Sequence, residues 1–182
     1  YAQLEQGSYP TSYIPTQGTV KSRFADVCTN GGNEQVINST EGVLYAEISA
    51  LANDGTVRAI YISNGTTSNR LWIEFDTVAN RFEARYIANG TTSANFFHTV
   101  SDITDFNKIA FKWKENNFSL YVNGLQVATD TSGSVISADT LNRVDFHNQA
   151  SSSVQNLFGK TKDVKVYNTA LTDQELAALT QV

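Results

Sequence analysis

Apolar and polar residues alternate along most of the chain from Glu41 onward. In residues 44–49, for example, Leu44, Ala46 and Ile48 are separated by polar or amphipathic residues. The same period of two recurs in residues 70–75, 81–86, 108–114 and 118–123. A period of two, repeated at short spacing, is typical of antiparallel strands that bury one face. The pattern therefore predicts an all-β sandwich or barrel.

Turn residues separate these segments. Asn-Gly pairs occur at residues 64–65, 89–90 and 123–124, and Asn-Gly favours the positive φ angles of tight hairpins. The sequence ISNGTTSNR of residues 62–70 returns as IANGTTSAN at residues 87–95. Two copies are too few for a solenoid or propeller, so they predict two similar hairpin loops at one end of a sandwich.

The chain ends in a strand followed by a short helix. Residues 164–167 alternate, and Thr172 and Glu175 have the spacing of a capping box, in which each residue satisfies the backbone N–H of the other. Leu176 and Leu179 give the helix an apolar side. The fold class predicted is an antiparallel β-sandwich of jelly-roll type with one C-terminal helix, which we expect to cover an open sheet edge.

The first 18 residues differ from the rest. They contain both prolines, Pro10 and Pro15, and proline cannot donate a hydrogen bond to a sheet. We expect residues 1–18 to be a connector arm from a preceding module and residues 19–182 to form one sandwich domain. The chain starts at Tyr1 and contains no methionine, so we also expect it to be part of a longer protein.

Composition and charge argue against two kinds of binding partner, nucleic acids and membranes. The net charge is −5 and the basic residues are scattered, which argues against nucleic-acid binding. No apolar run reaches membrane-spanning length, so no membrane partner is expected. The single cysteine, Cys28, excludes a disulfide within the chain.

Three segments resemble the laminin G-like, concanavalin A-like lectin/glucanase superfamily. FNKIAFKWKENNFSLYVNGLQVATD (residues 106–130) is similar to a hairpin of that family, and KDVKVYNTALTDQELAAL (residues 162–179) is similar to its final strand and closing helix. AQLEQGSYPTSYIPT (residues 2–16) resembles a segment of bacteriophage structural and bacterial surface proteins. The resemblance implies a concanavalin A-like jelly roll. Its members include lectins, carbohydrate-binding modules, adhesion modules and glycoside hydrolases, so fold alone does not decide function.

The residues argue against catalysis. Hydrolases of this superfamily carry the pattern Glu-x-Asp-x-x-Glu, whereas here Glu74 and Asp76 are followed by Ala79. His98 and His147 lack metal-ligand spacing, and no nucleophile elbow or phosphate loop is present. We therefore predict that the protein is not an enzyme and assign no catalytic residue or metal ligand. The resemblance leaves structural calcium open, but the sequence does not assign it to any residues.

Sugar recognition combines flat aromatic faces with polar groups that contact hydroxyls, and the middle strands offer that mixture. Trp72 lies among the polar positions of its segment, so we predict a partly exposed stacking platform; the alternative is a core residue whose strand is reversed by a bulge. Glu83 either lies opposite Glu74 or pairs with an arginine. The candidate glycan-binding residues are Tyr45, Tyr61, Arg70, Trp72, Glu74, Glu83 and Arg85.

A second candidate site is the rim of the two similar loops, although turn chemistry alone explains its residues. Its members are Asn64, Thr66, Thr67, Asn89, Thr91 and Thr92.

These observations and the resemblance favour a non-catalytic carbohydrate-binding, lectin-like module of a larger phage virion or bacterial surface protein. The expected partners are a polysaccharide or cell-surface glycan and the neighbouring domains of the parent protein, and the expected location is extracellular or on a virion surface. One alternative is a structural or decoration domain of a virion with protein partners. A third is a glycoside hydrolase or polysaccharide lyase, whose activity would depend on Glu74.

Overall fold

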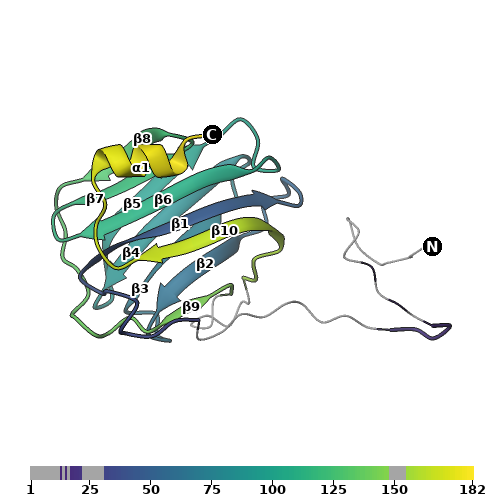
Figure 1. The fold of residues 1–182 in the computed structure, drawn as a ribbon, viewed down its shortest axis with the longest axis horizontal. Helices are drawn as coiled ribbons and strands as arrows, with labels where there is room; N and C mark the ends of the chain where they lie inside the picture. Colours follow the sequence, from purple (N-terminus) through teal and green to yellow (C-terminus); the bar gives the residue numbers. More distant parts are fainter. Residues whose placement is uncertain (1–12, 14, 16, 22–30, 148–154) are drawn as a thin grey trace.

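A computed structural model describes residues 13, 15, 17–21, 31–147 and 155–182. Strands and a helix between Glu41 and Thr180 form two packed antiparallel sheets with one helix. The front sheet, nearer the viewer in Figure 1, has the order β10-β1-β6-β7-β8. The back sheet has the order β5-β4-β3-β2-β9. The predicted antiparallel sandwich with a C-terminal helix is confirmed.

The elements have the following bounds. The front-sheet strands are β1 (Glu41–Ala50), β6 (Asn107–Lys114), β7 (Phe118–Val122), β8 (Leu125–Asp130) and β10 (Gly159–Tyr167). The back-sheet strands are β2 (Arg58–Ser63), β3 (Arg70–Phe75), β4 (Arg81–Ala88), β5 (Thr91–Thr99) and β9 (Arg143–Asp145). The helix α1 is Asp173–Thr180.

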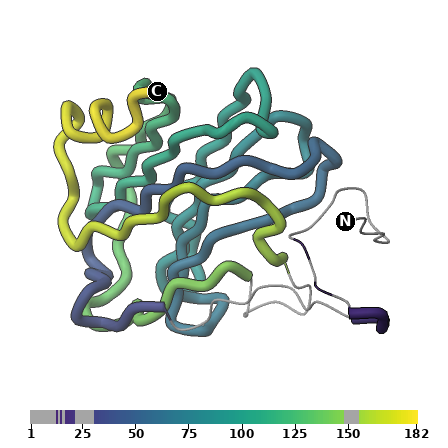
Figure 2. The backbone as a smooth tube through the Cα atoms, turned by 45° about the vertical axis from the view of Figure 1, so that its right-hand side comes forward, coloured from purple at the N-terminus to yellow at the C-terminus, as the bar shows by residue number. Residues whose placement is uncertain are grey.

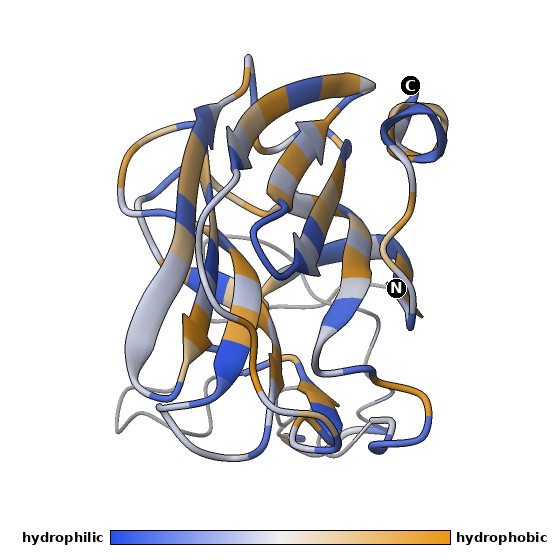
Figure 3. Ribbon diagram, turned by 90° about the vertical axis from the view of Figure 1, so that its left-hand side faces the viewer, coloured by the Kyte–Doolittle hydropathy of each residue, from blue (hydrophilic) through white to orange (hydrophobic). Residues whose placement is uncertain are grey.

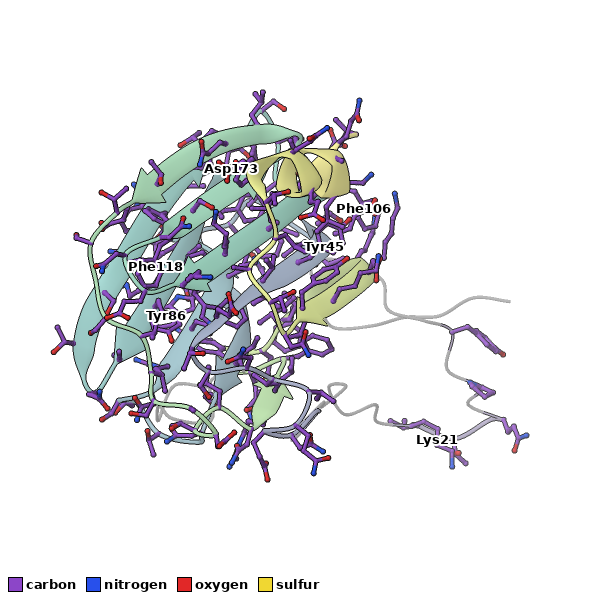
Figure 4. All side chains as sticks on the ribbon, turned by 60° about the vertical axis from the view of Figure 1, so that its left-hand side comes forward. Lys21, Tyr45, Tyr86, Phe106, Phe118 and Asp173 are labelled. Atoms are coloured by element: carbon purple, nitrogen blue, oxygen red, sulfur yellow. The ribbon has the colours of Figure 1, made fainter. Side chains whose placement is uncertain are left out.

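The core lies between the two sheets and is built from the alternating apolar positions. Trp113, Tyr86 and Phe118 are among the largest fully buried side chains, and Figure 4 shows Tyr86 and Phe118 inside the sandwich. Trp113 is a core residue, as predicted. The Tyr86 hydroxyl donates to the Ser39 carbonyl at 2.9 Å and accepts from the Ile136 N–H, so the buried phenol is satisfied. Figure 3 shows the alternation of apolar and polar residues along the strands.

The tight turns follow the sequence at two of the three Asn-Gly pairs. Asn89 and Gly90 have φ of 50° and 79°, and Asn123 and Gly124 have similar values, as a type I′ hairpin requires. The pair at residues 64–65 does not form a two-residue turn, because β2 ends at Ser63 and β3 begins at Arg70. Six residues therefore connect these strands, and the two copies of the repeated sequence adopt different structures.

The capping box at the start of α1 is confirmed. The Thr172 side chain accepts from the Glu175 N–H, and the Glu175 carboxylate accepts from the Thr172 N–H at 2.8 Å. The expectation that the helix covers a sheet edge is wrong. Leu176 packs against Val43, Tyr45, Ala110 and Tyr121, so α1 covers the outer face of the front sheet (Figures 1 and 2).

Candidate functional site

The outer face of the back sheet, here called the back face, brings together most of the predicted site residues. Strand register places Tyr61 opposite Trp72, and Trp72 opposite Arg85. The next row across the sheet pairs Glu74 with Glu83, and Glu83 with Phe97. These side chains share one face because their inward neighbours, such as Ile73, belong to the core.

Two aromatic rings and two guanidinium groups form the centre of the back face. The rings of Tyr61 and Trp72 lie 5.4 Å apart at 32°. The guanidinium carbons of Arg70 and Arg85 lie 4.8 and 5.2 Å from the centre of the Trp72 ring, within the range of cation–π attraction. The arrangement stacks flat aromatic surface beneath positively charged hydrogen-bond donors.

The predicted partial exposure of Trp72 is wrong, since only 4% of this residue is exposed. The alternative of a reversed strand is wrong as well. Leu71 and Phe75 lie in the core, and β3 pairs regularly with both neighbours. Trp72 points away from the core and is nevertheless buried in a small cluster with Ala59, Tyr61 and Ile87.

Glu74 and Glu83 face each other in the middle of the back face, with exposures of 7% and 6%. Burial, together with the hydrogen bond and negative charge of Glu83, raises the pKa of Glu74 to about 8. Glu83 also forms an ion pair with Arg85 at 2.5 Å. Both sequence interpretations of Glu83 therefore hold, because it lies opposite Glu74 and pairs with an arginine.

Tyr61 connects the carboxyl pair to the C-terminal part of the chain. Its hydroxyl donates to the Gln155 side-chain oxygen at 2.8 Å and lies 3.5 Å from the Glu74 carboxyl. Burial, followed by the charge of Glu74, raises the pKa of the Tyr61 phenol. The phenol is therefore neutral at physiological pH and acts through hydrogen bonds.

Phe97 is a candidate that the sequence reasoning missed. It lies on the edge strand β5, is 44% exposed, and is stacked by the guanidinium of Arg81 at 4.6 Å. Asp76 forms an ion pair with Arg81, which holds the arginine in place. The signal available in the sequence was Phe97 adjoining Phe96, where one of two consecutive aromatic residues in a strand must face outward.

Tyr45 does not belong to this site. It lies on β1 in the front sheet, buried in the cluster beneath α1, with Lys165 5.2 Å from its ring. Figure 4 shows Tyr45 on the side of the sandwich that carries α1 and Asp173. The prediction grouped Tyr45 with the back face because alternation identifies the outward side of a strand but not the sheet to which the strand belongs.

The two loops of the predicted rim lie side by side. The Asn89 N–H donates to the Asn69 side chain, and the Gly90 N–H donates to the Ser68 carbonyl, both at 2.9 Å. The Asn64 side chain accepts from the N–H and hydroxyl of Thr66. These local bonds are ordinary turn chemistry, so the rim stays a prediction without further support.

Other parts of the described chain give less evidence of a functional site. A pocket at the start of α1 is lined by two lysines, but Lys112 pairs with Asp173 and Lys114 pairs with Glu41. Among the residues that the structure describes, no group of three or more metal-ligating side chains is found. Within the same residues, no helix is long and apolar enough to cross a membrane.

A profile of the concanavalin A-like lectin/glucanases superfamily matches residues 28–177. The chain belongs to this superfamily. No curated protein sequence matches it significantly.

Solved structures of this superfamily's fold resemble the chain at low identity. The CBM40 module of the Ruminococcus gnavus IT-sialidase, bound to α2,3-sialyllactose, is 18% identical, with a TM-score of 0.66 over 87% of this chain and 96% of the module. The leech intramolecular trans-sialidase gives 20% identity and a TM-score of 0.64 over 79% of this chain. The chain spans only 24% of that enzyme.

A third similar structure is domain 4 of the Geobacillus stearothermophilus arabinanase AbnA, in complex with arabinotriose. It is 11% identical, with a TM-score of 0.58 over 82% of this chain and 70% of that domain. At these identities the likenesses establish a shared fold.

Proposed function

We propose that this domain is a non-catalytic carbohydrate-binding module and that the back face is its glycan-binding surface. The observation that carries the proposal is the cluster of Tyr61 and Trp72 beneath Arg70 and Arg85, beside the Glu74–Glu83 pair. Aromatic surface for stacking, with a few convergent polar groups, is the composition of small-molecule sites in general. Two similar structures carry sialyllactose and arabinotriose, which supports the class of ligand.

The carboxyl geometry favours binding over hydrolysis. Glycoside hydrolysis needs two carboxyl groups about 5–10 Å apart, on either side of the scissile bond. Glu74 and Glu83 are direct cross-strand partners on the same face and both are buried, so they do not lie on opposite sides of an open space for a sugar. We therefore retain the prediction of a binding module over the hydrolase alternative.

We further propose that the domain works as part of a larger surface or virion protein, outside the cell, where it would attach its parent to a glycan. A sandwich of this fold forms 24% of the leech enzyme and a single domain of the bacterial arabinanase, which supports a modular arrangement. The virion and bacterial-surface setting rests on the sequence resemblance.

The test is a glycan array that includes α2,3-sialyllactose, α2,6-sialyllactose and arabino-oligosaccharides, read with and without calcium. We expect binding to at least one group of related glycans. Arg85→Gln should weaken that binding at least tenfold, or about 1.4 kcal/mol, since arginine is enriched among the few residues that carry most of a site's binding energy. Lys114→Gln, which removes a partly exposed charge from the front sheet, is the matched control and should bind as the parent does. An array without any binding would contradict the proposal.

A further inference from the structure

The carboxyl pair at the centre of the back face needs an explanation. Glu74 on β3 and Glu83 on β4 are direct cross-strand partners and both are buried. Like charges directly opposite each other destabilise a sheet, and buried charges are expensive unless paired. Arg85 provides a cation for Glu83. Among the described residues, a negative charge on Glu74 as well would have no comparable ion pair to stabilise it.

The neighbouring charged and titratable groups do not offset the free energy needed to keep both buried carboxyl groups negatively charged. Tyr61 approaches Glu74 from β2, and negative charge is added by Asp76, which directly follows β3, and by Glu83 on β4. Arg70 and Arg85 are the nearby cations, and both guanidinium groups lie over the ring of Trp72. Asp145 on β9 lies opposite Tyr61 and adds a further acidic residue to the same face.

Hydrogen-bond geometry favours a proton on this pair. The Tyr61 hydroxyl has one hydrogen, and its short contact, at 2.8 Å, is with the oxygen of Gln155. Its longer contact, at 3.5 Å, is with Glu74. The single hydroxyl hydrogen cannot serve both acceptors fully, and the shorter contact is the one to Gln155. Tyr61 therefore gives a Glu74 carboxylate little hydrogen-bond compensation, and this favours a proton on the carboxyl pair.

We propose that Glu74 and Glu83 share one proton in the free protein and that glycan binding on the back face is linked to this proton. The inference rests on the proposed function of this face. With the shared proton in place, the pair carries one negative charge instead of two beside a bound glycan. As the pair loses its proton, the face becomes a poorer glycan site.

Desolvation sets the direction of the linkage. A glycan that covers the back face removes water from the carboxyl pair, and loss of water favours the neutral form of a carboxyl group. Because linkage is reciprocal, a ligand that strengthens proton binding is itself bound more tightly by the protonated protein. Affinity therefore falls with rising pH. A glycan that raises the pKa of the pair by one unit is bound about tenfold more weakly well above that pKa than well below it.

The first experiment measures affinity against pH. Every oligosaccharide that binds on the array is titrated at about pH 6 and about pH 9.5 with the parent protein, Glu74→Gln, Glu83→Gln and Glu47→Gln. Glu47 lies on β1 in the front sheet and is the control. We expect the parent and the control to lose about tenfold in affinity at the higher pH. Glu74→Gln, which keeps a neutral donor, should bind equally at both.

The second experiment detects the proton without any ligand. Carbon-13 NMR of the glutamate carboxyl groups should show one that titrates near pH 8, since burial and the opposing Glu83 raise the pKa of Glu74. That titration should be missing in Glu74→Gln. In Glu83→Gln it should move to lower pH, because the opposing carboxylate is gone. Thermal unfolding of each variant verifies that it is folded.

The outcomes separate this inference from the proposed function. Binding that is equally strong at both pH values would overturn the linkage and leave the glycan site standing. Titration of every glutamate near its usual pKa would overturn the shared proton, whether or not a glycan binds. Failure to bind any glycan at either pH would overturn the proposed function and the linkage together, while the shared proton would still be decided by NMR.

Discussion

Both outer faces of the sandwich are formed by the outward residues of alternating strands, but one face is covered by a helix and the other by none that the structure describes. On the front sheet, α1 covers an apolar cluster around Leu176, and the buried Lys112 pairs with Asp173 of the helix. On the back sheet, no described helix covers the strands, and the outward side chains include two opposed carboxyl groups. The front face follows the usual rules of stability, whereas the back face departs from them.

That difference indicates where function lies. A covered apolar cluster stabilises a fold, and a buried lysine with a carboxylate partner costs less than a buried lysine without one. Folding stability does not explain a buried like-charge pair or arginines stacked on a buried tryptophan. Features of this kind are concentrated at functional sites. The following predictions test whether the two faces differ in this way.

The largest effect is expected for Trp72→Ala. Because Trp72 is buried, we expect the free energy of unfolding to fall by about 3 kcal/mol. Glycan affinity should fall at least about thirtyfold, equivalent to about 2 kcal/mol. Trp113→Ala should cost a similar amount of stability, as Trp113 is fully buried between the sheets, and should leave the affinity of the folded protein unchanged. Chemical denaturation and calorimetric titration measure the two quantities, and full affinity in Trp72→Ala would remove Trp72 from the site.

Leu176→Ala tests the covered face. Leu176 is fully buried beneath α1, so we expect a loss of about 2–4 kcal/mol in denaturant unfolding. Leu179 is only partly buried, and Leu179→Ala should cost less. Neither substitution should alter glycan affinity. Weakened glycan binding in folded Leu176→Ala would mean that the front face takes part in recognition.

Stability should depend on pH through Glu74. Its pKa is raised in the folded state, chiefly by burial, from 4.5 to about 8. The folded protein therefore keeps a proton that the unfolded chain releases, and stability falls as the pH rises from about 4.5 to about 8. Glu74→Gln should remove this decline and be more stable than the parent at pH 9 by about 1–3 kcal/mol. Denaturant unfolding of both proteins between about pH 4.5 and about pH 9 measures this difference in stability. If stability changes with pH in the same way in both proteins, Glu74 ionises normally.

Asp173→Asn should give the smallest effect. It removes the partner of the buried Lys112 but lies on an exposed position itself, so we expect a loss of about 1 kcal/mol. Gln174→Ala, at the next exposed position of α1, is the control and should change stability by less. An unchanged stability in Asp173→Asn would show that the opposite-charge pair does not help to hold the helix on the front sheet.

Local features of the sequence predicted much of the fold. The capping box at Thr172 and Glu175 depends on residues three apart, and the two-residue turn at Asn89 depends on its own φ angle and that of Gly90. Alternation identified the outward side of each strand for the same reason. These features need no knowledge of distant contacts.

The site was only partly predictable because it depends on which strands become neighbours. Tyr45 has the outward position expected, but its strand belongs to the front sheet. Trp72 is buried by side chains from neighbouring strands, with the guanidinium of Arg85 over its ring. Phe97 was missed because its exposure follows from the position of β5 at a sheet edge. Each of these features depends on residues that lie far apart in the sequence.

The most direct test of the glycan-binding back face uses the two tryptophans as internal reporters. The chain has only Trp72 and Trp113, so a two-dimensional spectrum of nitrogen-15-labelled protein contains two indole N–H signals. The Trp113 indole donates to the Asn38 carbonyl at 3.2 Å inside the sandwich, whereas Trp72 lies on the back face. Titration with an oligosaccharide that binds on the array should shift the Trp72 signal and leave that of Trp113 in place. Saturable binding that leaves the Trp72 signal unmoved would contradict the account.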